Sequence, residues 1–191
     1  GTAEDPYQIS TAEDMFALAK AVNQDHEDYE GSYFRLTNDI DLGTNADNPW
    51  TPIGRNPSTK SPQFLGSFDG AHNTVRGLYV DANSGYVGLF GAIGLPSGNS
   101  TAEIKNLRVE GYVRAARTSS FFYIGGISGF VGLGAKITDC SFQGTVEAII
   151  TKDASAAYAG GIAGYNFGTI SGCDVSDSTI YGDHSSSGTN Y

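Results

Sequence analysis

The sequence predicts an all-β solenoid, a parallel β-helix of about four coils with a helix-containing cap at its N-terminal end. Two observations predict this fold. A tyrosine- and glycine-rich phrase occurs three times, at residues 86–91, 123–129 and 158–164, and a second phrase follows each copy at a spacing of 33 residues. The repeated segments are also rich in glycine and β-branched residues and lack the apolar spacing of a helix. Repetition at a fixed period is typical of stacked units that bury their apolar faces only against their neighbours.

A β-propeller is the alternative architecture for such repeats. A propeller blade needs four antiparallel strands in roughly 40 to 50 residues, and three or four blades would barely close a ring. The 33-residue unit is shorter than a blade, so the parallel β-helix is favoured.

The second phrase sets the expected register of the coils. Ile104, Ile137 and Ile170 begin three copies of it, and the segment that begins at Val75 resembles a fourth, earlier copy. The third position of each copy is Asn, Asp or Gly, the residues that most readily adopt a positive φ, which predicts a left-handed corner there. The expected corners are Gly77, Asn106, Asp139 and Gly172.

Equivalent residues of successive coils are expected to lie above one another, about 4.8 Å apart. The expected ladders are Ile104, Ile137 and Ile170; Phe90, Ile127 and Ile162; and Cys140 and Cys173. Parallel Cβ vectors on adjacent rungs give poor disulfide geometry, so we predict two buried free thiols.

Residues 1–45 have a different pattern and are predicted to form the cap. Ser10-Thr11-Ala12-Glu13 has the pattern of a capping box and precedes a segment with an amphipathic, helical spacing of apolar residues. A helix across the end of a solenoid would cover strand edges that otherwise promote aggregation. Residues 46–191 are assigned to the β-helix, and Tyr191, 33 residues after Tyr158, predicts a fragment of a longer array.

Several segments resemble the GLUG-motif repeat proteins, and together they cover almost the whole chain. These segments are GTAEDPYQISTAEDMFALAKAVN, YFRLTNDIDL, WTPIG, FLGSFDGAHNTVRGLYV, YVGLFG, YIGGISG and YAGGIAG. The Gly-Leu-any-Gly core of that family is present at Gly88-Leu89-Phe90-Gly91, whereas the two later copies have isoleucine in place of leucine.

The resemblance implies a right-handed parallel β-helix in a secreted or cell-surface bacterial protein of the adhesin-like kind, abundant in gut bacteria. Similar repeats occur in the non-catalytic portions of some immunoglobulin A proteases. The family has no agreed catalytic residues, so the resemblance implies shape and location rather than chemistry.

The charge balance argues against several classes of partner. The formal net charge is −10, and the 11 basic residues are scattered along the chain, whereas nucleic-acid binding needs clustered Lys and Arg. No segment approaches the roughly 18 consecutive apolar residues of a membrane span. We therefore expect neither nucleic-acid binding nor membrane insertion within these residues.

No cofactor is expected, and metal binding is disfavoured. His26, His72 and His184 lack the paired spacing of zinc ligands. Asp39 and Asp41 are weak candidates for calcium, but the segment lacks the acidic progression and the bidentate Glu of an EF-hand, so a solvated turn is favoured.

The features favour a non-catalytic stalk or adhesion module that binds an unknown glycan or protein. Tyr123, Phe121, Phe122 and Tyr158 are the candidate binding residues, because aromatic rings stack on sugars and anchor protein interfaces. The other interpretation is that the repeat tyrosines pack against one another as part of the fold.

A polysaccharide lyase or glycoside hydrolase with a β-helix fold, or its carbohydrate-binding part, is the alternative function. A glycosidase needs two carboxyl groups roughly 5 to 9 Å apart. Glu110 with Asp139, or Asp69 with Asp81, are the candidate pairs, although neither pair recurs in the repeats.

Overall fold

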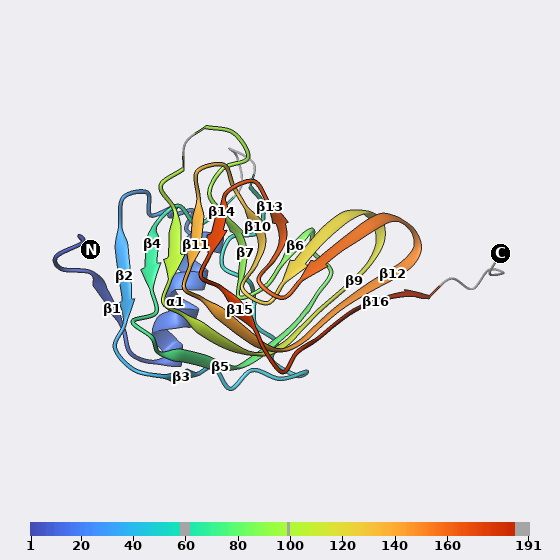
Figure 1. The fold of residues 1–191 in the computed structure, drawn as a ribbon, viewed down its shortest axis with the longest axis horizontal. Helices are drawn as coiled ribbons and strands as arrows, with labels where there is room; N and C mark the ends of the chain where they lie inside the picture. The colour runs from blue at the N-terminus through green and yellow to red at the C-terminus, as the bar shows by residue number, and fades with distance from the viewer. Residues whose placement is uncertain (58–61, 99, 186–191) are drawn as a thin grey trace.

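The computed structural model describes residues 1–57, 62–98 and 100–185, which form a parallel β-solenoid of about four turns with one helix (Figure 1). The strands form three sheets, and every registered pair of named strands is parallel. The predicted parallel solenoid is confirmed, and these pairings exclude the antiparallel blades of a propeller.

Each sheet collects one strand from successive turns. The six-stranded sheet has the order β1 (Tyr7–Ile9), β2 (Tyr33–Leu36), β4 (Ser67–Asp69), β8 (Glu103–Lys105), β11 (Lys136–Thr138) and β14 (Thr169–Ser171). The three-stranded sheet contains β7 (Phe90–Ile93), β10 (Ser128–Val131) and β13 (Ala163–Asn166). The third sheet contains β3 (Ile40–Asp41), β5 (Thr74–Ala82), β9 (Arg108–Gly125), β12 (Ser141–Gly160) and β15 (Asp174–Val175), with β6 (Tyr86–Val87) paired to β9 and β16 (Thr179–Ser185) paired to β12.

The 33-residue step sets the register of the later turns. Ile104 pairs with Ile137, and Ile137 pairs with Ile170. The column continues toward the N-terminus through Phe68 and Phe34, where the turns have other lengths. These apolar side chains fill the interior of the solenoid and, apart from the half-buried Ile170, are buried.

The corners of the later turns have the conformation that the sequence predicts. Asn106, Asp139 and Gly172 directly follow β8, β11 and β14, and their φ angles are 52°, 52° and 64°. The chain leaves the six-stranded sheet at each of these residues and enters the sheet of β9, β12 and β15.

The alignment of Val75 with Ile104 is wrong. Val75 pairs with Val109, and Phe68 is the residue that pairs with Ile104. Gly77 has a positive φ of 66°, but it lies within β5 at an interruption of the register between Val75 and Leu78. It therefore forms a bulge rather than a corner. A bulge and a corner each place one residue of positive φ between two alternating segments, so the sequence pattern does not distinguish a bulge from a corner.

The ladder predicted for Phe90, Ile127 and Ile162 is displaced by one residue. Phe90 pairs with Ser128, and Ser128 pairs with Ala163. Ser128 is fully buried, and its hydroxyl donates a hydrogen bond of 2.9 Å to the carbonyl oxygen of Phe130. This bond satisfies a polar group in an otherwise apolar column, which makes a serine tolerable at that position.

The predicted amphipathic helix is present as α1 (Ala12–Asn23), and its capping box begins one residue later than the sequence pattern indicated. Thr11 is the N-cap, and its hydroxyl accepts a hydrogen bond from the backbone N–H of Asp14 at 3.1 Å. The Asp14 carboxylate accepts the backbone N–H of Thr11 at 2.9 Å in return. Backbone hydrogen bonds from Ser10 and Thr11 lower the pKa of Asp14.

Helix α1 forms the crossover between β1 and β2 and buries the face that carries Met15, Leu18, Ala19 and Val22. The strands β2 and β3 pair with β4 and β5 of the repeats, and β1 pairs with β2, so residues 1–45 also contribute rungs to the solenoid. The division of the chain into 1–45 and 46–191 stays a prediction.

The last described turn exposes the columns that are buried one turn earlier. Val175 pairs with Phe142, and Ile180 pairs with Val146. Phe142 and Val146 are fully buried, whereas Val175 and Ile180 are 39% and 43% exposed. Each exposed residue occupies the same column as its buried partner. The difference in exposure therefore arises because a later turn covers Phe142 and Val146, whereas no described turn covers Val175 and Ile180.

Ile137 and Ile170 test this stacking because they occupy one column at a covered and an uncovered rung. We expect Ile137→Ala to lower the free energy of unfolding by about 2–5 kcal/mol, since it leaves a cavity between two rungs. Ile170→Ala, at a half-buried site, is expected to cost less. Urea unfolding followed by far-ultraviolet circular dichroism measures both, and equal losses would contradict the stacked arrangement.

Candidate binding surface

The repeat tyrosines stack on one another along one corner of the solenoid. Tyr86 pairs with Tyr123, and Tyr123 pairs with Tyr158. The ring centroids are 5.4 Å and 5.2 Å apart, with interplanar angles of 19° and 22°. The tyrosines thus pack against one another as part of the fold. Tyr191, the next expected member, lies outside the described residues.

A second aromatic column lies against the tyrosines. Phe130 and Tyr165 are register partners on β10 and β13, and their rings stack with centroids 6.1 Å apart. Tyr165 contacts Tyr123 at 4.9 Å, and Phe167 meets Tyr165 edge-on at 4.9 Å. We call the six residues Tyr86, Tyr123, Tyr158, Phe130, Tyr165 and Phe167 the aromatic corner. Sequence reasoning missed its second column, although Phe130 and Tyr165 each directly follow a tyrosine- and glycine-rich phrase.

The four aromatic residues predicted to bind a ligand have different surroundings. Phe121 is 50% and Tyr158 is 41% exposed, and their ring centroids are 6.3 Å apart. Tyr123 is half-buried between Tyr86 and Tyr158. Phe122 is fully buried in the core, so its assignment to a binding surface is wrong. Side chains alternate between the two faces of a strand, which places Phe122 opposite its two neighbours.

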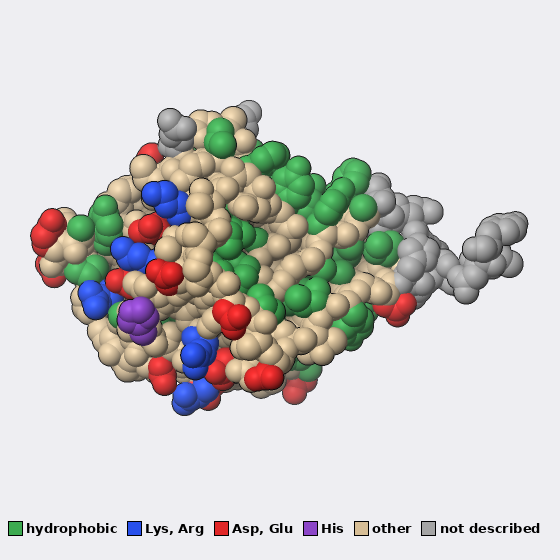
Figure 2. All heavy atoms as spheres, viewed as in Figure 1, with side chains coloured by type: hydrophobic (Ala, Val, Ile, Leu, Met, Phe, Trp, Pro, Cys, Tyr) green, Lys and Arg blue, Asp and Glu red, His purple; other side chains and the backbone are tan. Residues whose placement is uncertain are grey.

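Hydrophobic side chains gather on the side of the molecule that carries the aromatic corner. Figure 2 shows them over β10 and β13 and along the arch formed by β9 and β12, whereas most charged side chains lie toward the N-terminal strands (Figure 1). Burial raises the pKa of Tyr86 and of Tyr123, so both hydroxyls stay protonated at neutral pH. The surface therefore offers aromatic rings with neutral hydroxyl groups.

A ladder of alternating charge crosses β5, β9 and β12. Asp81 pairs with Arg114, and Arg114 pairs with Glu147. Arg114 Nη1 lies 2.6 Å from Asp81 Oδ1, and its Nε lies 3.6 Å from Glu147 Oε2. The Tyr112 hydroxyl donates a hydrogen bond to Glu147, and burial together with this bond raises the pKa of Tyr112. One guanidinium thus compensates two carboxylates.

Two of the four carboxylates proposed for glycosidase pairs, those of Asp69 and Asp81, have structural partners. Asp69 accepts hydrogen bonds from the Asn106 amide at 3.0 Å and from the backbone N–H of Ala71 at 2.8 Å. Burial acts to raise the pKa of Asp69, but these hydrogen bonds and the positive charges of Lys105 and Arg35 together outweigh it, and the pKa lies below its ordinary value. Asp81 lies on β5, where it pairs with Arg114. In the other pair, Asp139 forms a corner, and Glu110 lies within β9.

The two candidate calcium ligands connect β3 to its neighbours. Asp39 Oδ1 accepts the backbone N–H of Thr74 at 2.8 Å. Asp41 Oδ1 accepts the backbone N–H of Gly43 at 3.0 Å, and its Oδ2 lies 3.3 Å from Arg76 Nε. Across residues 1–57, 62–98 and 100–185, no group of three or more His, Cys, Asp or Glu side chains is placed to hold a metal ion.

Cys140 and Cys173 precede paired segments of β12 and β15, and both are free thiols. The Cys140 thiol donates to the carbonyl oxygen of Thr138 at 3.2 Å, and the Cys173 thiol donates to that of Ser171 at 3.4 Å. Cys140 is buried, whereas Cys173 is half-buried, so the prediction that both are buried is wrong for Cys173. Cys173 lies in the last described turn, where no further rung covers the column.

Known proteins resemble this chain in sequence and in fold. The model described as the GLUG motif matches residues 155–181, which include the third tyrosine- and glycine-rich phrase and confirm the resemblance there. Halomucin from Haloquadratum walsbyi (strain DSM 16790 / HBSQ001) is 26% identical over 170 residues. That match covers 74% of this chain and 2% of Halomucin, so the chain spans a small part of the length of this relative.

A crystal structure of a candidate immunoglobulin A1 protease from Bacteroides ovatus has a similar fold. It matches with a TM-score of 0.51 and 18% identity, over 95% of this chain and 69% of that chain. This likeness shows a shared fold. In the part of the chain that the structure describes, no helix has the length and apolar character needed to cross a membrane.

The two thiols are expected to differ in reactivity. Burial raises the pKa of Cys140 to about 12, and the thiolate is the reactive form, so iodoacetamide at pH 8 is expected to modify Cys173 and to spare Cys140. Mass spectrometry of peptides from the labelled protein measures this difference. Both thiols are expected to react in urea, and equal labelling of the folded protein would contradict the arrangement.

Proposed function

We propose that this chain is a non-catalytic β-solenoid module of a secreted or cell-surface protein, where it serves as a stalk with an adhesive surface for a glycan or protein. The observation that carries the proposal is the continuity of the side-chain columns, which run through the successive turns. Such columns suit a rod that grows by stacking turns, with aromatic side chains displayed along one corner.

The stalk role is supported by columns of apolar side chains that run from turn to turn. Val175, Ile180 and Tyr181 are 39%, 43% and 41% exposed, and Val175 and Ile180 continue columns that are fully buried at Phe142 and Val146. Each turn of such a column adds about 4.8 Å of length. The small share of Halomucin that the chain covers fits a module of a longer protein.

The adhesive role is supported by exposed rings that the fold holds rigid. Phe121, Tyr158 and Phe167 are each 41–50% exposed, and each contacts at least one other aromatic ring. A ring held in place loses little conformational entropy when it binds a sugar face or an apolar protein surface.

Substitution of the two exposed rings tests this role. If Phe121 and Tyr158 contact the ligand, Phe121→Ala and Tyr158→Ala are each expected to weaken binding to positive features of a glycan and mucin-protein array severalfold, because a stacked ring contributes about 1 kcal/mol. Tyr33→Ala is the matched control, since Tyr33 is 36% exposed on β2 and lies in a different sheet. Equal loss in all three variants would argue against a binding surface at Phe121 and Tyr158.

The same preparation distinguishes an adhesive module from a polysaccharide lyase or hydrolase. We expect no release of reducing sugar and no unsaturated product from pectin, mucin or chondroitin, because Arg114 compensates Asp81 and Glu147 and the hydrogen bonds to Asp69 hold that carboxylate ionised. Reducing-sugar assays and absorbance of unsaturated products measure this. Product release that Glu147→Gln abolishes would replace the proposal with an enzymatic one.

A further inference from the structure

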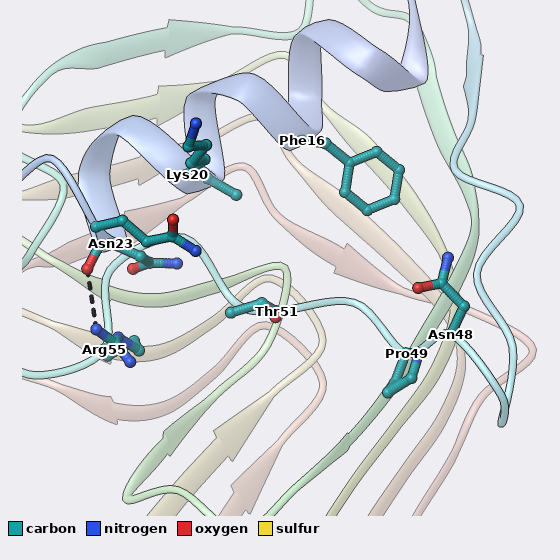
Figure 3. Close-up of a pocket in the computed structure, with 9 residues that line it drawn as sticks. Phe16, Lys20, Asn23, Asn48, Pro49, Thr51 and Arg55 are labelled. Carbon is teal, nitrogen blue, oxygen red and sulfur yellow. Dashed lines mark hydrogen bonds between the residues drawn. The ribbon is translucent and has the colours of Figure 1, made fainter.

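Helix α1 and the segment 48–55 enclose a cavity of about 260 Å³ that the functions above leave unassigned. Its walls include Phe16 and Lys20 from the helix and Asn48, Thr51 and Arg55 from the segment. Figure 3 shows the Phe16 ring projecting from α1 toward Asn48 and Pro49, with Arg55 beside the C-terminal end of the helix. The cavity lies just below the range of about 300–1,000 Å³ typical of drug-sized ligands, which suits one small ring.

The charge of this cavity is opposite to that of the chain. Its lining contains two cations, Lys20 and Arg55, and no Asp or Glu, although acidic residues outnumber basic ones by 21 to 11 in the sequence. Elsewhere Arg35, Arg76, Lys105 and Arg114 each lie within 4.0 Å of a carboxylate. In the described ranges, no such ion pair involves Lys20 or Arg55. The two cations therefore favour an anionic ligand.

Hydrogen bonds around Asn23 hold the exposed Arg55 in position. Arg55 Nη2 donates to the carbonyl oxygen of Asn23 at 2.9 Å. The Asn23 side chain is buried, donates to the carbonyl oxygen of Pro52 at 2.9 Å and accepts the backbone N–H of Gly54 at 3.0 Å. Asn23 thus joins the helix end to the segment that carries Arg55. A guanidinium has five N–H donors, so the contact to Asn23 leaves donors for a carboxylate.

The remaining walls provide a fixed ring and neutral polar groups. Phe16 is half-buried and packs against Trp50 with ring centroids 5.1 Å apart. The Trp50 indole N–H donates to the carbonyl oxygen of Leu89 at 2.9 Å, which fixes the pair of rings. Asn48 and Thr51 add an exposed amide and a hydroxyl. An aromatic ring, hydroxyl-binding groups and two cations together match the apolar face, hydroxyls and carboxylate of a sugar acid.

We propose that this cavity binds a sugar acid, a single sugar ring with one carboxylate such as the terminal residue of an acidic glycan. The inference rests on the proposed adhesive role and assigns a ligand site that contains none of the residues of the aromatic corner. Arg55 binds the carboxylate, Lys20 adds positive charge on the wall that the helix forms, Phe16 packs against the apolar face of the ring, and Asn48 and Thr51 bind hydroxyl groups.

Lys20 also lies in the last turn of α1, where a positive charge stabilises the helix whether or not a ligand binds. The test therefore measures stability and binding separately. Lys20→Met and Arg55→Gln remove the two charges, and Lys136→Met removes an exposed charge on β11, outside the cavity, as the matched control.

Isothermal titration of the whole chain with glucuronic acid and N-acetylneuraminic acid tests the proposal, with glucose as the neutral probe and an N-acetylated dipeptide as the non-sugar carboxylate. At least one sugar acid is expected to bind, and both neutral and peptide probes are expected to bind at least about tenfold more weakly. Arg55→Gln is expected to weaken sugar-acid binding about tenfold and Lys20→Met severalfold, whereas Lys136→Met leaves it unchanged. Added salt weakens the binding as it screens the charges.

Equal binding of glucose, equal binding of the acetylated dipeptide, or binding that neither cavity variant alters would overturn the assignment. Circular dichroism reports whether Arg55→Gln still folds. If Arg55→Gln does not fold, the effect of Lys20→Met on sugar-acid binding tests the proposal. Array binding that depends on Phe121 and Tyr158, without any sugar-acid binding, would refute this cavity and leave the adhesive role intact. If sugar-acid binding requires Arg55 and array binding is unchanged in Phe121→Ala and Tyr158→Ala, the cavity is supported. Phe121 and Tyr158 are then removed from the proposed function.

Discussion

The parallel register between successive turns is the constraint on which the structure depends. It places each repeated side chain about 4.8 Å from its own counterpart, so a residue must be compatible with a copy of itself or with a complementary group. Isoleucines meet this condition by apolar packing at Ile104 and Ile137, and tyrosines meet it by stacking at Tyr86 and Tyr123. Charged residues meet it by alternation, as Arg114 lies between Asp81 and Glu147.

The first and the last described turns differ in how far their apolar side chains are buried. At the N-terminal end, α1 replaces the strands of a turn and buries Met15 and Leu18 against the first rungs, while the link through Asn23 holds the adjacent segment. In the last described turn, Val175 and Ile180 are apolar and partly exposed. Helix α1 and the segment 48–55 form an irregular surface outside the repeats, and the cavity with Arg55 lies there.

The sequence predicts what repeats and fails where turns differ. Equal spacing is enough to place Ile137, Asn106 and Asp139, because identical turns have identical corners. It misplaces Val75 and Phe90, since matching similar phrases does not reveal a bulge or a turn of different length. Phe122 was assigned to the surface because a run of three aromatic residues does not reveal which one points inward. The cavity joins a helix to an irregular segment, and no local pattern predicts that contact.

Repeated and unrepeated residues are therefore subject to different structural constraints. A side chain within a column, such as Tyr123, is held by the copies above and below it, so changing it for a ligand would disturb the fold. Phe121 has an alanine, Ala156, as its register partner, and it stands outside the tyrosine column. Lys20 and Arg55 belong to no column of the repeats. Such positions are free of the requirement for self-compatibility, so selection for a ligand can act on them without cost to the stacking of the turns.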